Sequence, residues 1–344
     1  MSSIWSRKDA HVHLAEMNYQ AHANNGFDDV RLVHQSLTTV DIADVNLNTK
    51  IGTFDLEVPF FINAMTGGSP KTKIINQNLS RIAKECHLAM AVGSVSIALK
   101  HDDSEIRDSF TIVRKENPDG FIFSNIGAHH SLENAKRAVD LLQADALQVH
   151  LNIPQEIVMP EGDRAFSSWL HNIETLVQHL DVPVIVKEVG FGMSQETIQQ
   201  LLDIGVTMID VAGRGGTNFI QIENERREQE EFSYLYDWGQ TTAESLLEAQ
   251  PFLSQADFIA SGGIRNPLDI IKAYSLGAKA VGLSGEILHQ CLTQGNDATI
   301  ATLLNWQEHL KKLMSLTGTK TIQELTKTKK VFSLELENWK KQRN

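Results

Sequence analysis

The sequence predicts an α/β fold, a (β/α)8 TIM barrel with an N-terminal arm and a C-terminal helical extension. Three observations indicate this fold. From residue 59 onward, short apolar runs alternate with amphipathic segments of helical period. There are eight such runs, and eight βα units favour a closed barrel over an open sheet. Polar residues and glycines follow the runs, at the strand ends where barrel enzymes hold ligands.

The regular part of the chain supplies both kinds of element in alternation. Strands are expected at residues 60–65, 89–92, 121–124, 146–151, 182–188, 208–212, 258–261 and 280–284. Helices are expected at residues 74–86, 103–116, 132–143, 166–180, 194–204, 241–252, 267–276 and 286–294. No strand leads into a G-x-G-x-x-G turn that opens a helix, which argues against a Rossmann dinucleotide site.

Two regions fall outside this alternation. Residues 1–58 form an arm or cap with a strand-like segment at 37–42, and residues 59–295 form the barrel. Residues 296–344 are expected to add a helix at 298–315, a second helix beginning at 319–325 and a basic tail. This extension is expected to pack under the barrel or at a contact between subunits.

Composition narrows the class of protein and of partner. The 344-residue chain carries a net charge of −12, which argues against a nucleic-acid partner. It has no apolar run of the roughly 18 residues that a membrane span needs, and its N-terminus lacks the apolar core of a signal peptide. We therefore expect a cytoplasmic protein without membrane contacts. Cys86 and Cys291 form no CxxC pair, and buried thiols are expected.

A phosphate site is indicated by two strand ends near the end of the barrel. The run 258–260 is followed by Ser261-Gly-Gly-Ile-Arg265, and the next strand ends in Ser284-Gly285. Glycines at such a turn expose backbone N–H groups that can bind phosphate. The pair resembles the phosphate site after strands seven and eight of a barrel. A glycine pair alone can also serve only close packing.

Two connections are longer than simple turns. They cover residues 153–165 and 214–239, and long loops in a compact domain are usually functional or mobile. The second contains the charge run 223–231, which we expect to form a solvated helix rather than a site.

Polar residues inside the strands are candidates for chemistry. Lys187 lies in an apolar strand, where an ammonium group is costly without an anionic partner or an electron-rich ring. Lys187 and the neighbouring Glu188 must point to opposite faces, so they cannot serve the same pocket. Gln148, His150 and Asn152 share one face of their strand, which favours contact with a ligand over a structural role.

The arm carries the other cationic group. Arg7, Lys8, His11 and His13 lie close together in sequence, and arginine suits bidentate contact with phosphate. An exposed basic N-terminus alone means little. Together with the glycine loops, however, it would permit two phosphorylated ligands.

The motifs together resemble the type 2 isopentenyl diphosphate isomerases. The match runs over nearly the whole chain in the order Arg7-Lys-Asp-x-His11, Ala64-Met-Thr-Gly-Gly68, Val92-Gly-Ser94, Gln148-Val-His-Leu-Asn152 with Gln155-Glu156, Pro160-Glu-Gly-Asp163, Val186-Lys-Glu-Val-Gly190, Gly213-Arg-Gly-Gly-Thr-Asn-Phe219 and Ser261-Gly-Gly-Ile-Arg265. The Arg-Lys-Asp-x-His and Gln-Val-His-Leu-Asn elements are specific to the family. The glycine pair is shared with flavin-dependent barrel oxidases more widely.

The resemblance implies FMN, Mg²⁺, NADPH as the reductant of the flavin, and interconversion of isopentenyl and dimethylallyl diphosphate in isoprenoid biosynthesis. It implies that reduced flavin, through N5, acts as acid or base. It places FMN on Met65, Thr66, Gly67, Ser94, Asn125, Lys187, Thr217, Gly262, Gly263, Ile264, Arg265, Ser284 and Gly285. It places the substrate on Arg7, Lys8, His11, Ser94, Ser96 and Gln155, with His150, Asn152 and Gln155 supporting the chemistry and Glu156 as ligand of Mg²⁺.

Two positions depart from the family pattern, and one alternative function stays open. Ala212 stands where many members have a small polar residue, and Trp238-Gly-Gln-Thr241 replaces a Trp-Gly-Ile-Pro turn. The alternative is an FMN-dependent 2-hydroxy acid oxidase or dehydrogenase, which would use His150 as base but would leave the basic arm without a role. Barrels of this group often associate, so a homo-oligomer, a tetramer or octamer, is expected.

Overall fold

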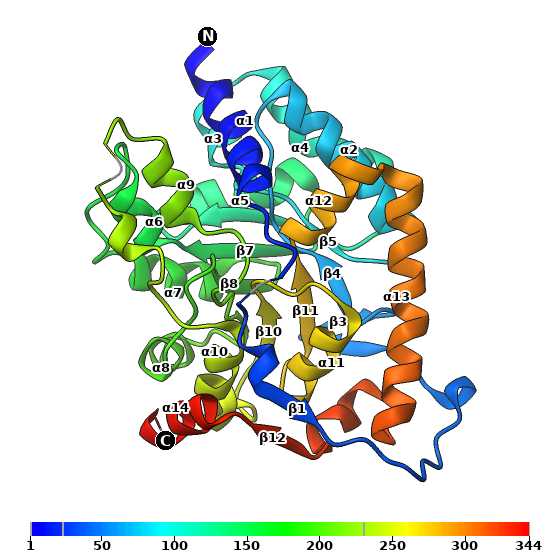
Figure 1. Cartoon of the computed structure of the whole chain (residues 1–344). Helices are drawn as coiled ribbons and strands as arrows, with labels where there is room; N and C mark the ends of the chain where they lie inside the picture. The colour runs from blue at the N-terminus through cyan, green and yellow to red at the C-terminus, as the bar shows by residue number, and fades with distance from the viewer. Residues whose placement is uncertain (1, 23, 230, 344) are drawn as a thin grey trace.

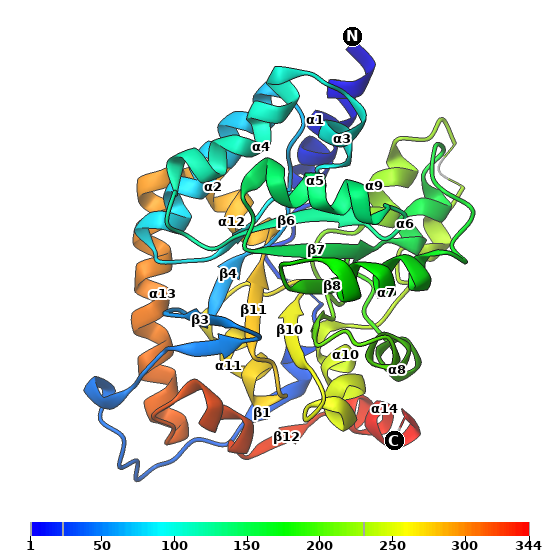
Figure 2. The ribbon, with the colours of Figure 1, turned by 180° about the vertical axis from the view of Figure 1, so that it is seen from behind.

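The computed structural model describes residues 2–22, 24–229 and 231–343, with side chains from residue 7 onward. Its centre is a closed parallel barrel with the strand order β10-β11-β4-β5-β6-β7-β8-β9 (Figures 1 and 2). The strands are β4 (Phe60–Ile62), β5 (Met90–Ala91), β6 (Ile122–Gly127), β7 (Ala146–Leu151), β8 (Val184–Glu188), β9 (Met208–Asp210), β10 (Asp257–Ser261) and β11 (Ala280–Leu283). All eight expected strands are present, which confirms the predicted barrel.

Each barrel strand is followed by at least one helix on the outside of the barrel (Figure 1). The eight expected helices are α2 (Pro70–Glu85), α4 (Ser104–Glu116), α5 (Leu132–Leu142), α7 (Trp169–His179), α8 (Gln195–Asp203), α10 (Thr242–Ala249), α11 (Pro267–Ser275) and α12 (Gly285–Gln294). Short segments η3 (Ser233–Leu235) and η4 (Gln250–Phe252) flank α10. The side chain of Thr241 accepts a hydrogen bond from the backbone N–H of Glu244, so the unusual Trp-Gly-Gln-Thr turn ends in a helix cap.

The loops after β5, β7 and β9 contain helices that the sequence pattern did not predict. These are α3 (Ser96–Lys100), α6 (Ile153–Val158) and α9 (Phe219–Glu225). The expected solvated helix at 223–231 is wrong: α9 ends within this run, and Glu223 and Asn224 are buried. Residue 230 of the run lies outside the described residues.

The arm and the C-terminal extension meet on the outside of the barrel. The arm contains α1 (Ser2–Met17), η1 (Phe27–Asp29), β1 (Val30–Leu32) and η2 (Ile42–Asp44). The extension contains α13 (Asn296–Thr317), η5 (Ile322–Lys327), β12 (Lys330–Phe332) and α14 (Leu334–Arg343). β1 and β12 pair antiparallel, so the two regions share a small sheet. The expected strand at 37–42 is wrong, because these residues pair with no other strand among the described residues and Leu37 is 93% exposed.

The barrel interior is apolar at its N-terminal end and is closed there by a hairpin. The hairpin strands β2 (Thr49–Ile51) and β3 (Phe54–Leu56) pair antiparallel. Their side chains belong to one cluster with inward-facing residues of the barrel strands, namely Ile51, Phe54, Leu56, Phe61, Ala89, Ala91, Phe123, Ala146, Ile185, Met208, Ile259 and Ala280. A ligand site can therefore lie only at the C-terminal ends of the barrel strands.

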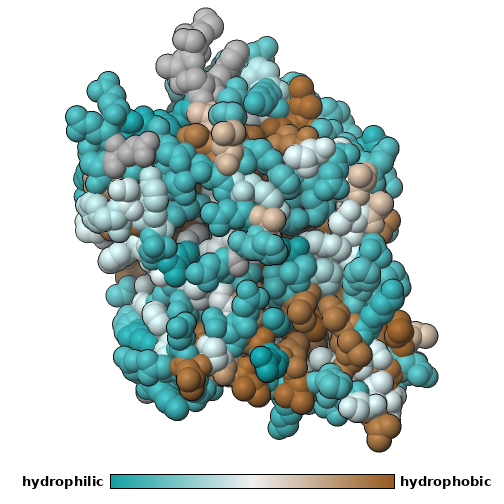
Figure 3. Space-filling model, in the orientation of Figure 1, coloured by the Kyte–Doolittle hydropathy of each residue, from teal (hydrophilic) through white to brown (hydrophobic). Residues whose placement is uncertain are grey.

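The surface is mixed, and the described helices include none that is long and apolar enough to cross a membrane. Figure 3 shows that hydrophobic residues gather over the lower part of one face, where β1 and β12 lie in Figure 1. Both cysteines are buried and free, as predicted.

Candidate active site

A cavity of about 560 Å³ lies at the C-terminal ends of the barrel strands. It takes side chains from the arm, from the barrel strand ends and from the loops that follow them. Of the residues predicted as site residues, Gly67 does not line this cavity. Those that do are Arg7, Lys8, His11, Met65, Thr66, Ser94, Ser96, Asn125, His150, Asn152, Gln155, Glu156, Lys187, Thr217, Gly262, Gly263, Ile264, Arg265, Ser284 and Gly285.

Gly67 instead serves packing behind the cavity wall. A Cβ atom at this position would lie 2.0 Å from the ring of Phe110. The absence of a side chain therefore lets the loop after β4 lie against α4.

The loops after β10 and β11 form one end of the cavity. Gly262 has a φ of 101°, and a Cβ there would lie 1.9 Å from the carbonyl oxygen of Gly213. Only glycine allows the two backbones to approach so closely. Ser284 and Gly285 stand at the N-terminus of α12, where free N–H groups and the helix dipole favour an anion.

Lys187 and Glu188 point to opposite sides of β8, as predicted. Lys187 lines the cavity, is 7% exposed and donates a hydrogen bond to the carbonyl oxygen of Glu188 (2.7 Å). Burial lowers the pKa of Lys187, whereas the nearby Asp210 raises it. The carboxylate of Glu188 accepts three backbone N–H groups of the following loop instead, from Val189 to Phe191.

The polar row of β7 is divided between the cavity and the layer beneath it. His150 and Asn152 line the cavity, whereas Gln148 is fully buried below them and is not part of its wall. The ring Nδ1 of His150 lies 2.8 Å from Oδ1 of Asn125. Burial, and next Lys187, lower the pKa of His150 well below its usual value, so this ring is uncharged at neutral pH.

Helix α1 places the basic residues of the arm over the cavity. Arg7, Lys8 and His11 line it, whereas His13 faces solvent. Burial, and next the charge of Arg7, lower the pKa of Lys8 to about 8, although Glu223 opposes the shift. These three side chains form a cationic rim of the cavity. Arg7 and Lys8 carry its charge at neutral pH, because burial lowers the pKa of His11.

Polar contacts hold the arm to the barrel in the middle of α1 and just beyond its C-terminal end. Asp9 accepts a hydrogen bond from Ser69 (2.6 Å), the N-cap residue of α2. Beyond the helix, the hydroxyl of Tyr19 donates to Glu286 of α12 (2.6 Å), and its ring stacks on His289 with 3.7 Å between centroids. The guanidinium of Arg265 also lies over this ring, 5.0 Å from its centroid.

Glu223 is a site residue that the sequence reasoning missed. Its side chain is fully buried and lies between the arm and α6: Oε1 is 3.1 Å from Nε2 of His11 and accepts a hydrogen bond from Gln155 (2.8 Å). It also pairs with Arg226. Burial alone would raise the pKa of Glu223, but His11, Gln155 and Arg226 bring it to about 2. A count of charges along the chain cannot show this, because the partners come from two distant segments.

The segment after β7 contributes carboxylates to the cavity. Glu156 is 9% exposed; one oxygen accepts from Asn152 (2.8 Å) and the other from the N–H of Asp163 (2.7 Å). The described residues contain no group of three or more His, Cys, Asp or Glu side chains placed to hold a metal ion. Mg²⁺ at Glu156 would therefore need most of its ligands from phosphate and water, which this cation accepts.

A second polar chain lines the opposite wall. The hydroxyl of Ser94 lies 2.8 Å from that of Ser96, which lies 2.7 Å from Nε2 of the buried His130. Burial lowers the pKa of His130 to about 4, so its ring is neutral. Its Nδ1 lies 3.3 Å from Nδ2 of Asn134, which can only donate, so Nε2 carries the hydrogen and donates it to Ser96. Lys100, one helical turn beyond Ser96, also lines the cavity and was not predicted.

Comparisons with known proteins find similar chains over nearly the whole length of this one. Residues 105–331 match a family described as FMN-dependent dehydrogenase. The chain is 50% identical over 337 residues to an isopentenyl-diphosphate delta-isomerase of Staphylococcus saprophyticus, covering 98% of this chain and 96% of the relative. It is 49% identical over 338 residues to a protein of the same name from Latilactobacillus sakei, with the same coverage of 98% and 96%.

Solved structures show the same fold at low identity. A mandelate oxidase variant with 2-hydroxy-phenylacetamide is 15% identical, with a TM-score of 0.63 and coverage of 95% of this chain and 91% of the other. A flavocytochrome b2 variant with benzoylformate is 18% identical, with a TM-score of 0.65 and coverage of 91% and 77%. These likenesses support the barrel fold alone.

Proposed function

Because this chain belongs to the isopentenyl-diphosphate delta-isomerase family, we propose that it interconverts isopentenyl and dimethylallyl diphosphate with FMN as cofactor. One observation carries the proposal. The basic residues of the arm and the glycine loops after β10 and β11 line the same cavity, although they stand at opposite ends of the chain. Two anion-binding features in one cavity suit a phosphorylated cofactor and a diphosphate substrate.

The residues fit FMN at the barrel end of the cavity. The loops of Gly262 and Gly285 offer backbone N–H groups to its phosphate, and Arg265 adds a cation nearby. Lys187 supplies a buried positive charge to the polar edge of the ring system, and Thr66 and Asn125 supply hydrogen bonds. Reduced FMN would supply the group that gives or takes the proton moved in the isomerisation.

The arm side of the cavity then binds the substrate. Arg7, Lys8 and His11 contact the diphosphate, with Ser94 and Ser96 on the other wall. Glu156, which lines the cavity, would hold Mg²⁺ there, and the ion would neutralise charge on the diphosphate. Asn152 and Gln155 lie between these groups and orient the allylic part, and their hydrogen bonds to Glu156 and Glu223 fix their own positions.

The alternative of a 2-hydroxy acid oxidase has less support. Under that function the three arm residues of the rim would have no ligand of their own. The relatives with about half of their residues identical bear the isomerase name, whereas the oxidase likeness extends to the fold alone.

A spectrum and one assay test the proposal. Purified protein should be yellow, and after anaerobic reduction with NADPH in the presence of Mg²⁺ it should equilibrate the two diphosphates without net change in the flavin redox state. A colourless protein, or net oxidation of a hydroxy acid by the same preparation, would contradict it. Substituting NADH for NADPH tests which nicotinamide reduces the flavin.

A further inference from the structure

A row of buried polar side chains crosses the barrel directly beneath the cavity. It runs from Asp210 at the end of β9 through Asn63, Gln148 and Asn125 to His150 on β7. Asn63 directly follows β4, and β4 and β7 are not neighbours in the barrel, so the row passes through the interior rather than along the wall. The four residues below His150 are at most 3% exposed. Their polar atoms must therefore find hydrogen-bond partners within the protein.

The donor-to-acceptor direction of the hydrogen bonds in the row is fixed at Asn63. Its Nδ2 donates to Oδ2 of Asp210 (2.7 Å), and its Oδ1 accepts from the backbone N–H of Ala64 (2.9 Å). A backbone N–H can only donate, so the amide of Asn63 has one possible orientation. Asp210 also accepts from Ser261 (2.7 Å) and from the N–H of Ala212 (3.1 Å), so the hydrogen-bond partners of its carboxylate are all donors. Burial raises the pKa of Asp210, while Lys187 and these donors favour the charged form.

The orientation of Asn63 fixes the donor and the acceptor in each following hydrogen bond of the row. Oδ1 of Asn63 requires a donor, which is Nε2 of Gln148 at 2.9 Å. Oε1 of Gln148 then accepts from Nδ2 of Asn125 at 3.1 Å. The remaining atom of that amide, Oδ1, lies 2.8 Å from Nδ1 of His150. Because an amide oxygen can only accept, Nδ1 of His150 must carry the hydrogen.

We propose that Asn63, Gln148 and Asn125 are positioning residues that hold His150 in the Nδ1–H tautomer and so present the lone pair of Nε2 to the cavity. Nε2 has no hydrogen-bond partner within the described part of the chain. In this state His150 accepts a hydrogen bond from an N–H or O–H group of a bound molecule. It orients that molecule and does not act as a proton donor.

The charges around His150 agree with this role. Lys187 pairs with His150 in the register of β7 and β8, and Lys8 and His129 also line the cavity. A further positive charge on His150 would be repelled by the ammonium groups of Lys187 and Lys8, whereas burial lowers the pKa of His129 and leaves that ring uncharged at neutral pH. A neutral ring with a fixed tautomer offers a directional acceptor without adding charge to the cationic rim.

Nuclear magnetic resonance of protein labelled with ¹⁵N-histidine tests the tautomer directly. His150→Gln identifies the signals of His150 in two-bond ¹⁵N–¹H spectra at neutral pH. We expect a protonated Nδ1 and an unprotonated Nε2. A protonated Nε2, or an equal mixture of the two forms, would overturn the proposal. The measurement needs no substrate, so it is independent of the proposed function.

Two variants test whether the row causes this tautomer. Gln148→Met removes the link at similar side-chain size, and the Nδ1–H population of His150 should fall. Ser124→Ala is the matched control, because Ser124 is equally buried and lies on the strand of Asn125 but has no hydrogen bond to the row. An unchanged His150 in Gln148→Met, or an equal change in Ser124→Ala, would show that the row does not set the tautomer.

A third variant keeps the test available if Gln148→Met does not fold. Asn125→Asp retains an acceptor for Nδ1–H but adds a charge, so His150 should keep its tautomer and titrate at a higher pH than in the unmodified protein. Unchanged titration would contradict the contact between residues 125 and 150. If the isomerase function holds, Gln148→Met should also lower kcat/KM about threefold to tenfold, the worth of one oriented hydrogen bond.

Discussion

The charge of Lys8 depends on pH within the range in which the protein would be assayed. Its pKa of about 8 lies below that of a free lysine because burial disfavours the ammonium group. The group is therefore charged below pH 8 in the substrate-free protein and becomes neutral above it. A bound diphosphate would favour the charged form and would raise the pKa in the complex.

The pH dependence of KM is the first prediction. KM for the diphosphate should rise as the pH increases through 8, while FMN stays bound. Lys8→Arg should shift this rise to higher pH, because a guanidinium group keeps its charge there. Steady-state kinetics from pH 7 to 9.5 measures both effects. Equal pH profiles for the two proteins would remove Lys8 from the diphosphate site, and loss of FMN in Lys8→Ala would mean that the arm was wrongly assigned.

The burial of Glu223 could not be predicted from the sequence. Glycine turns and strand-end polar residues were recognisable because their roles follow from local backbone geometry. The burial of Glu223 follows from His11 and Gln155, which come from two other segments, and no local pattern records these contacts. The same applies to Lys100, which lines the cavity because of a short helix that the sequence did not indicate.

At the scale of elements, Tyr19 fastens the end of the arm to the barrel. Its ring contacts both His289 and the guanidinium of Arg265, and its hydroxyl donates a hydrogen bond to Glu286. Burial, and next Glu286, raise the pKa of Tyr19 to about 12, so the hydroxyl remains a donor at any ordinary pH.

Loosening of the arm is the second prediction. Tyr19→Ala should raise KM for the diphosphate several-fold and speed proteolytic cleavage within residues 7–22, with little change in global unfolding. Tyr19→Phe keeps the stacking and should have a smaller effect. Tyr234→Ala is the control, because that tyrosine is 75% exposed. Cleavage of the arm at equal rates in all these proteins would show that Tyr19 does not hold it.

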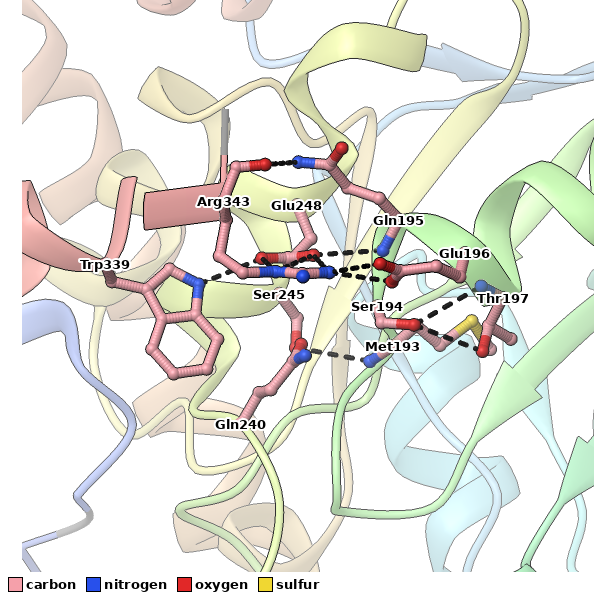
Figure 4. A network of polar contacts seen from close by, with 10 residues as sticks. All are labelled: Met193, Ser194, Gln195, Glu196, Thr197, Gln240, Ser245, Glu248, Trp339 and Arg343. Carbon is pink, nitrogen blue, oxygen red and sulfur yellow. Dashed lines mark hydrogen bonds and ion pairs between the residues drawn. The ribbon is translucent and has the colours of Figure 1, made fainter. Parts of the chain in front are cut away.

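The C-terminal helix α14 is fastened to the barrel helices by a buried carboxylate. Figure 4 shows Trp339 and Arg343 of α14 around Glu248 of α10, whose side chain is fully buried. Glu248 accepts from Nε1 of Trp339 (3.0 Å), from Nε of Arg343 (3.0 Å) and from the N–H of Gln195 at the start of α8 (3.0 Å). The helix thus joins α10 to α8.

Loss of this attachment is the third prediction. Arg343→Ala leaves the buried Glu248 short of a charged donor and should lower the free energy of unfolding by about 1–3 kcal/mol. Lys341→Ala on the same helix is the control, because its side chain is 71% exposed. Urea unfolding of the two variants measures the difference. An equal effect of both substitutions would mean that Glu248 does not depend on Arg343.

Elements with their own pattern could be predicted, and elements defined by distant partners could not. The barrel strands and their helices were found because hydrophobic period and turn residues mark them locally. The pairing of β1 with β12 joins segments some 300 residues apart, and each strand has only three residues. The strand expected at 37–42 had suitable residues but no partner, and a strand without a partner leaves its backbone groups to water.

At the scale of the whole molecule, the cavity joins parts that are otherwise far apart in sequence. Its walls come from the arm, from barrel strands and from the loops after β10 and β11. A ligand that fills it therefore stabilises the fold as a unit, because it binds the assembled barrel and not the unfolded chain.

Stabilisation by FMN is the fourth prediction. At about 100 times the dissociation constant, FMN should add about 2.7 kcal/mol to the free energy of unfolding. Thermal unfolding of the apoprotein with increasing FMN measures this. Riboflavin, which lacks the phosphate, is the matched ligand and should stabilise much less if the glycine loops hold the phosphate. Equal effects of the two flavins would remove the phosphate from these loops.

The hairpin β2–β3 at the base of the barrel decides how the cavity is filled. Because its side chains close that end, the cavity opens on the side of the arm. Under the proposed function, a cofactor seated on the barrel strands would enter before a diphosphate bound on the arm side, and it would leave after it. Turnover would exchange only the upper occupant, while the lower one stays from one cycle to the next. The hairpin would thereby impose an order of binding, in which the ligand that binds last leaves first.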